Sequence, residues 1–243
     1  MRDYLKIGLP VLLVFISALI SLMPLRTAMM MGKPAFFGYQ RVEGTVWNGK
    51  FHYPRIAGQE VRSLAVSLSP SGLLTGRAVT EFRLVGDEVK GDGTLALSLG
   101  GTMQLTDAAF DVTLERQAGM VRFQGGIYLS IDRLELTDQG CEMIEGAFRT
   151  DLMTPLSNMG LWTVPENTGA LTCNNGRIVM AITDGAGEER RQVSFTFDPL
   201  QMRLDTDISI RTGLQEVRDK LQQAGFRKRN NNWVWHHQER FGS

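Results

Sequence analysis

The residue types most capable of chemistry are few and widely spaced along the chain. There are only two cysteines, Cys141 and Cys173, and three histidines, His52, His236 and His237. Two cysteines favour one disulfide in an oxidising compartment such as the bacterial periplasm, and two small buried residues without a bond are the alternative. Because the histidines lie far from both cysteines in the sequence, we expect no zinc site.

Sequence motifs typical of enzymes are missing. No segment has the form GxSxG, HExxH, CxxC, a phosphate-binding P-loop or a dinucleotide-binding glycine motif. Acidic residues are scattered singly on the polar sides of predicted strands, whereas catalysis needs groups that converge in space. We therefore predict no catalytic residue, no metal ligand and no cofactor, and we favour a binding or scaffolding role over an enzyme.

The overall charge excludes one further class of function. The 26 basic and 26 acidic residues give a formal net charge of zero, and 43% of the residues are hydrophobic. Proteins that bind nucleic acid usually carry a basic surplus, so no nucleic-acid partner is expected. The hydrophobic content is sufficient for the core of one large domain or two smaller ones.

The longest apolar run extends from Ile7 to Leu25 and contains no charged residue. As a helix it would span about 28 Å, close to the thickness of a bilayer core. Arg26 and the bulky residues Met29 to Met31 follow it, where a signal-peptide cleavage site would need small residues. We predict an uncleaved transmembrane anchor at 7–25 followed by a linker at 26–40; a cleaved signal peptide and a buried core helix are the alternatives.

The charges that flank this run do not set its orientation. Arg2 and Lys6 before it are balanced by Arg26 and Lys33 after it. Loop charge asymmetry is the usual indicator of orientation, and here it is a tie.

From residue 41 onward the chain alternates apolar and polar residues in short segments. Leu64, Val66 and Leu68 are one example, and similar segments recur at spacings near ten residues as far as Ile210, separated by glycine-rich turn signals. This pattern predicts a mainly β fold: a large antiparallel, curved sheet, arranged as a β-groove or a sandwich, with one apolar face and one or two short helices. A faint internal similarity suggests two similar β units, about 41–140 and 141–211, followed by a C-terminal helix and strand.

Three segments interrupt or end this series of strands. Residues 151–161 are consistent with a short helix or a loop. Residues 212–225 have apolar positions at helical spacing, with Thr212 and Gln215 placed as in a capping box and Gly225 suited to the position after a helix end. Residues 227–241 are basic and aromatic and predict one last strand, either simply solvated or part of a patch for nucleic acid or lipid headgroups.

The segment Gly44-Thr45-Val46-Trp47-Asn48-Gly49 is a turn candidate. Asn48-Gly49 predicts a two-residue turn between paired strands, because both residues tolerate positive φ. Trp47 is expected to pack as a large apolar anchor more than to stack on a ligand.

Together with the N-terminal anchor, three motifs resemble the type II secretion system protein N family. They are Gly44 to Gly49, Gly72-Leu73-Leu74-Thr75-Gly76 after Pro70, and Gly169-x-Leu171-x-Cys173 with Gly176. The residues of the first motif that carry the resemblance are Gly44, Thr45, Val46, Trp47 and Gly49.

The resemblance implies an inner-membrane protein of Gram-negative bacteria with residues 1–6 in the cytoplasm and an all-β domain, 41–243, in the periplasm. Its implied partners are the inner membrane and other components of the apparatus that exports folded proteins across the outer membrane. The family is also similar to β-groove proteins that handle lipids, so binding or transfer of lipid between the two membranes is the alternative function.

Overall fold

The structure is a computed structural model that describes residues 22–31, 37–56, 59–118, 121–152, 154, 157, 166–187 and 189–240. The predicted anchor at 7–25 lies outside these residues except at its last four positions, and most of the predicted helix or loop at 151–161 also lies outside them. Within the described ranges, no helix is both long enough and apolar enough to cross a membrane.

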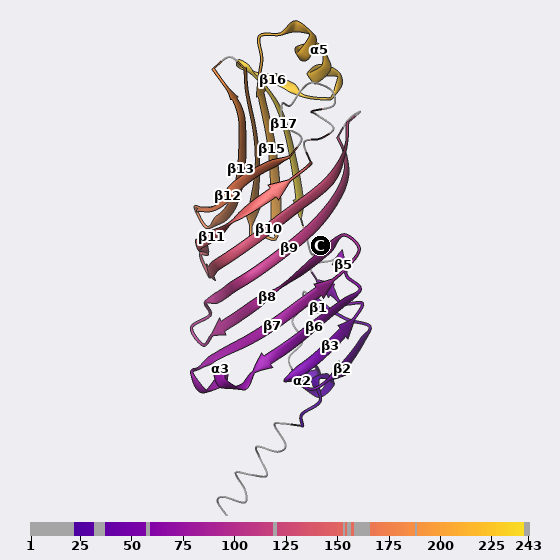
Figure 1. Cartoon of the computed structure of the whole chain (residues 1–243), viewed down its shortest axis with the longest axis vertical. Coiled ribbons are helices and arrows are strands. Elements are labelled where there is room, and N and C mark those ends of the chain that lie inside the picture. Colours follow the sequence, from indigo (N-terminus) through magenta and orange to yellow (C-terminus); the bar gives the residue numbers. More distant parts are fainter. Residues whose placement is uncertain are drawn as a thin grey trace, which may run out of the picture.

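The mainly β prediction is confirmed by a single large antiparallel sheet of 14 strands (Figure 1). In chain order its strands are β2 (Arg41–Gly44), β3 (Asn48–His52), β6 (Ser63–Ser69), β7 (Arg77–Val85), β8 (Val89–Ser98), β9 (Met103–Ala118), β10 (Val121–Thr137), β11 (Gly140–Thr150), β12 (Asn167–Asn174), β13 (Arg177–Ala186), β14 (Glu189–Asp198), β15 (Arg203–Arg211), β16 (Arg227–Arg229) and β17 (Asn232–Arg240). A small second sheet contains β1 (Phe37–Gly38), β4 (Arg55–Ile56) and β5 (Gln59–Glu60).

From β6 to β15, each strand pairs with the next one along the chain. At the C-terminal edge the order changes, because β17 returns beside β15 and β16 lies outside it. The basic C-terminal segment is therefore a hairpin of two strands, not the one strand that we predicted. Its turn contains Asn230 with a φ of +54°, a conformation that asparagine tolerates.

The strand registers sort the side chains into an apolar face and a polar face, since residues directly opposite each other in a ladder share a face. Leu64 lies opposite Leu84, and Ile182 lies opposite Val193. Followed from strand to strand, the apolar face includes Phe51, Leu64, Val66, Phe82, Leu95, Phe110, Ile131, Phe148, Leu171, Ile182, Val193 and Ile208. Because these positions belong to one continuous sheet, the fold is an open, curved sheet and not the sandwich that the sequence left open.

The C-terminal part of the sheet encloses its apolar face. Val193 and Ile210 are 0% exposed, and one contiguous cluster of buried side chains runs from β9 to β17. Helix α5 (Gln215–Gln223) adds its own fully buried residue, Leu221. In Figure 1, strands β12 to β17 are turned relative to β6 to β9, as expected for the accumulated twist of so many strands.

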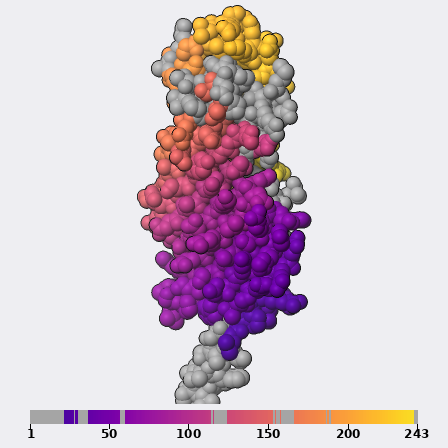
Figure 2. Space-filling model, turned by 45° about the vertical axis from the view of Figure 1, so that its right-hand side comes forward, coloured from indigo at the N-terminus to yellow at the C-terminus, as the bar shows by residue number. Residues whose placement is uncertain are grey.

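The N-terminal part leaves its apolar face more open. Leu64, Val66, Phe82 and Leu95 are only half-buried, and Leu97 is 45% exposed. Figure 2 shows the two parts in the elongated molecule, with the N-terminal strands in indigo and purple and the C-terminal strands in orange and yellow.

The helices differ from the sequence predictions in detail. Helix α5 begins at Gln215 after Leu214, which makes no side-chain capping bond, so the predicted capping box of Thr212 and Gln215 is wrong. The hydroxyl of Thr212 instead donates to Glu189 at 3.0 Å and accepts from the backbone of Leu214 at 3.2 Å. The predicted end is confirmed, since Gly225 follows the cap residue with a φ of +87°.

Two further short helices occupy regions where none was predicted. The turn signal beginning at Pro70 is a five-residue helix, α3 (Pro70–Leu74). Helix α2 (Leu25–Met31) begins at the last residue of the predicted anchor and continues into the predicted linker, which also contains strand β1. The two segments whose sequences are similar do not have the same structure. Val42 to Trp47 belong to β2 and the turn after it, whereas Ile144 to Phe148 lie inside β11. The division into two similar β units therefore stays a prediction.

Candidate functional site

A disulfide joins Cys141 on β11 to Cys173 on β12, with the two Cα atoms 5.6 Å apart. Four residue pairs join these strands, against ten between β10 and β11. The pairs start at Ala147, and Cys141 lies at the other end of the strand, where its amide donates to the carbonyl of Gly176 at 2.8 Å. The disulfide therefore fastens the end of this strand pair that the backbone ladder does not reach.

The family motif forms the connection between β2 and β3. Strand β3 already begins at Asn48, so the turn consists of Thr45, Val46 and Trp47, and the predicted two-residue turn at Asn48-Gly49 is wrong. Gly44 has a φ of +89°, and a Cβ there would collide with the carbonyl oxygen of Asn48. At Gly49, an added Cβ would meet the Cδ2 atom of Leu25, so the glycine lets this side chain pack closely against the strand.

The same turn holds the last residues of the predicted anchor. The amide of Val46 donates to the carbonyl of Met23 at 3.2 Å, and Pro24 forms an antiparallel bridge with Thr45. Leu25, the first residue of α2, is 7% exposed. The motif residues therefore fix the direction in which the chain enters the sheet, and we assign them a positioning role.

Trp47 connects this turn to the next long strand through its carbonyl. That oxygen accepts from the amide of Leu68 at 3.0 Å and from the hydroxyl of Ser67 at 3.3 Å. The expected role of Trp47 in packing is thus accompanied by a backbone contact that no sequence pattern indicated.

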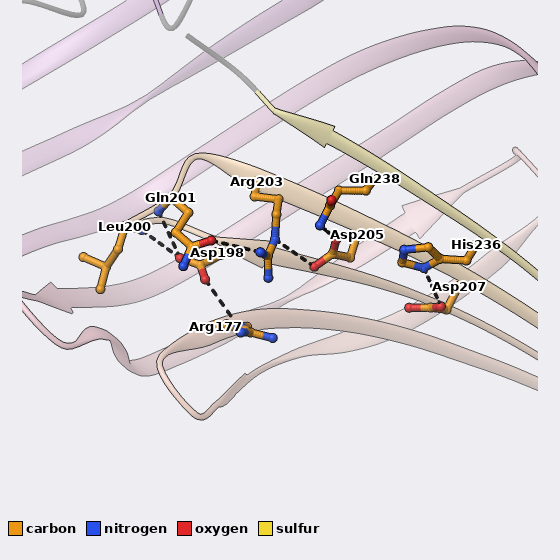
Figure 3. Close-up of polar contacts among 9 residues, drawn as sticks. All are labelled: Arg177, Asp198, Leu200, Gln201, Arg203, Asp205, Asp207, His236 and Gln238. Carbon is orange, nitrogen blue, oxygen red and sulfur yellow. Dashed lines mark hydrogen bonds and ion pairs between the residues drawn. The ribbon is translucent and has the colours of Figure 1, made fainter. Parts of the chain in front are cut away.

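A polar ladder crosses the polar face of β13, β14, β15 and β17 (Figure 3). At one end, Asp198 contacts Arg177 at 3.4 Å and accepts from the amides of Leu200 and Gln201, each at 3.1 Å. Next along β15, Asp205 contacts Arg203 at 3.1 Å. Carboxylates thus accept hydrogen bonds both from the backbone amides of the turn after β14 and from the guanidinium group of Arg203.

The other end of the polar ladder joins β15 to the last strand. Gln238 donates to Asp205 at 2.8 Å, and His236 lies 2.9 Å from Asp207. Each carboxylate of the ladder has a hydrogen-bond or ion-pair partner, and the arrangement links four strands. The alternation Arg203, Asp205, Asp207 was a visible sequence signal for one charged face, but its partners come from 29 and 33 residues further along the chain.

The polar face also has a hollow of about 350 Å³ over β6 to β9 in the N-terminal part, lined among others by Glu81, Arg83 and Asp92. Among the residues that the structure describes, no group of three His, Cys, Asp or Glu side chains is placed to hold a metal ion. Neither His236 nor His237 approaches the cysteines, which are joined to each other.

The fold and these contacts define a class of protein: an all-β scaffold made of one open, curved sheet with a continuous apolar face. The model of the family described as "Type II secretion system (T2SS), protein N" matches residues 37–234, which extend from β1 of the small sheet into β17 of the large sheet. The chain belongs to the type II secretion system protein N family, and the resemblance seen in the sequence is confirmed. No curated protein and no solved structure matches the chain.

Proposed function

We propose that this chain is an accessory component of the type II secretion system that acts in the periplasm by protein–protein contact while folded proteins are exported across the outer membrane. The family match over residues 37–234 carries this proposal. The run predicted as an anchor at 7–25 holds the chain in the inner membrane, except for its last residues, Met23 to Leu25, which contact the β2–β3 turn. Residues 1–6 stay in the cytoplasm. The disulfide between Cys141 and Cys173 supports a periplasmic location, since such bonds persist in oxidising compartments.

The edges of the sheet are poorly suited to receive a partner's strand. Strand β2 has only four residues, and the turn after it is bridged by Pro24. Strand β16 has three residues, all basic and exposed. Short, charged edges resist strand addition, so we place the contact elsewhere.

The N-terminal apolar surface, defined by Leu64, Val66, Phe82, Leu95 and Leu97, is the contact surface in this proposal. These side chains share one face of β6, β7 and β8 and are half-buried or exposed. A contiguous apolar area of this kind is a common feature of protein interaction sites. The partner is another secretion component, because the family belongs to that system.

Export by cells that lack the gene tests the proposal. Deletion should reduce secretion of type II substrates, and the wild-type gene should restore it. Leu95→Asp should fail to restore it, because a charge on the apolar surface opposes a dry contact. The matched control is Ala96→Asp, on the polar face of the same strand, which should restore export. Equal rescue by both variants would count against this surface.

The predicted topology has its own test. A reporter enzyme that works only in the periplasm should be active when it is fused after residue 243. Activity of a cytoplasmic reporter at the same position would reverse the orientation.

Lipid handling is the second candidate, and the half-buried apolar face is the observation that favours it. If this face holds acyl chains, protein purified from membranes should carry lipid that mass spectrometry identifies. Loss of the gene should then disturb envelope lipids while secretion remains normal.

A further inference from the structure

A small hollow is lined by residues from the end of β15, α5 and the β16–β17 hairpin. These elements lie at the end of the molecule opposite α2 (Figure 1). Its volume is about 220 Å³, and its lining includes Arg211, Thr212, Arg218, Lys228, Asn231 and Trp233. Three of these side chains are cations that come from three different elements: Arg211 from β15, Arg218 from α5 and Lys228 from β16. The hollow thus concentrates positive charge on a chain whose formal net charge is zero.

A row of arginines continues this charge across the polar face. Arg190 lies directly opposite Arg211, the Nε of Arg211 donates to the Asn232 side chain at 3.1 Å, and Asn232 lies directly opposite Arg229. Like charges directly opposite each other destabilise a sheet. None of these arginines forms an ion pair with a described residue, in contrast to the polar ladder on the same strands.

The carboxylates on the neighbouring elements already have other partners. Glu189 accepts from the amide of Gly213 at 2.8 Å and from the hydroxyl of Thr212 at 3.0 Å. On α5, the Lys220 ammonium lies 2.9 Å from Glu216, and its hydrogen bond and charge hold the pKa of that carboxyl below its usual value. The other oxygen of Glu189 lies 3.7 Å from Arg191, so neither Glu189 nor Glu216 forms an ion pair with Arg211, Arg218 or Lys228.

Arg218 is held in a defined position, because its Nε donates to the carbonyl of Thr212 at 3.2 Å. Its terminal nitrogens make no hydrogen bond to a described residue. Lys228 lies directly opposite Trp233, which is another lining residue. Two arginines, a lysine and a tryptophan thus line the same hollow.

We infer that this hollow binds a phosphate group, either free in solution or on the headgroup of a phosphorylated lipid. Guanidinium groups match the oxygens of phosphate in a two-pronged geometry, and lysine adds a point charge. The hollow is smaller than the roughly 300–1,000 Å³ typical of sites for drug-sized ligands, so it suits a headgroup or a small anion. This inference is independent of the proposed role in secretion.

The test is calorimetric titration of the purified full chain in detergent with inorganic phosphate, at about 0.15 M salt to screen unspecific attraction. The variant Arg211→Gln/Lys228→Gln removes two cations of the hollow. The matched control, Arg77→Gln/Lys90→Gln, removes the same two charge types from exposed positions on β7 and β8 that form no ion pair with a described residue. The hollow variant should bind phosphate about tenfold more weakly or worse, and the control should bind as the unmodified chain does.

A second arm identifies the source of the phosphate group. If the protein floats with phosphatidylcholine vesicles that contain phosphatidic acid, but not with vesicles of phosphatidylcholine alone, the ligand is a lipid headgroup. If the protein binds inorganic phosphate but does not float with either kind of vesicle, the ligand is a soluble anion. Arg211→Lys keeps the positive charge but loses the planar guanidinium group, so it should weaken phosphate binding less than the double variant does. This variant also provides a test if the double variant does not fold.

Three results would overturn the inference. One is equal phosphate affinity in the hollow variant and the matched control. Another is a failure to bind both inorganic phosphate and phosphatidic acid vesicles. The third is that a poly-glutamate peptide binds and neither inorganic phosphate nor phosphatidic acid vesicles do. In that case the hollow and the arginines beside it would be a contact for an acidic protein.

Discussion

The N-terminal and C-terminal parts of the sheet have the same alternation of apolar and polar residues, but they bury their apolar faces to different extents. In the C-terminal part, Val193 and Ile210 are 0% exposed, whereas Leu97 in the N-terminal part is 45% exposed. The C-terminal part curves around its apolar face and is closed by α5. The difference teaches that strand alternation determines which face is apolar, while the packing partners determine whether that face stabilises the fold or remains available for contact.

Two truncations of apolar side chains, one in each part, test most directly whether the two parts differ in packing. Ile210→Ala should lower the free energy of unfolding by about 2–5 kcal/mol, because it leaves a cavity in an enclosed core. Leu95→Ala should cost about 1 kcal/mol, since that half-buried side chain loses less burial. Denaturant unfolding of both variants measures the difference, and equal losses would mean that the two parts are equally packed.

The disulfide between β11 and β12 gives the next largest effect. Replacing Cys141 and Cys173 by serine should lower stability by about 2–4 kcal/mol, because the unfolded chain regains the freedom that the cross-link removed. Hydrogen exchange should accelerate first in β11 and β12, where only four residue pairs remain. Non-reducing mass spectrometry should find the bond in unmodified protein; two free thiols in material purified without reductant would refute it.

The entry of the chain into the N-terminal part is probed by Gly44→Ala. We expect a loss of about 1–3 kcal/mol, because alanine is strained at a φ of +89° and its Cβ would meet the carbonyl of Asn48. Gly101→Ala is the matched control: its φ is +82°, but no heavy atom lies within 4 Å of the added Cβ. Thermal unfolding should separate the two variants, and identical shifts would show that the collision has no role.

The smallest effect is expected on the polar ladder of the C-terminal part. Asp205→Asn should cost about 0.5–1 kcal/mol, since it weakens the contact with the mostly buried Arg203. Asp207→Asn should have almost no effect, because Asp207 and His236 are both largely exposed. A larger loss for Asp207→Asn than for Asp205→Asn would contradict the burial that separates these two contacts.

The parts of the fold that local chemistry determines could be predicted from the sequence. The alternation of Leu64, Val66 and Leu68 identified a strand and its apolar face, and the paired cysteines favoured a disulfide. The errors came from long-range contacts. Gly49 is glycine because Leu25 packs on it, and Thr212 does not cap α5 because its hydroxyl reaches Glu189, 23 residues away.

The basic hollow could not be predicted for the same reason. Arg211, Arg218 and Lys228 have no common spacing, and only the path from β15 through α5 to β16 brings them together. The strand β16 is also too short, at three residues, to produce an alternation signal. The sequence did show that the C-terminal segment is basic and aromatic, which was compatible with a solvated strand and with a headgroup patch.

The central claim is that the N-terminal apolar surface contacts another component of the secretion system. A photo-crosslinking amino acid placed at residue 95 in cells with an intact secretion system tests it most directly, with residue 96 on the polar face of the same strand as control. We expect residue 95 to capture a protein of the secretion apparatus and residue 96 to capture little. Capture of lipid alone at residue 95, or equal capture at both positions, would contradict the account.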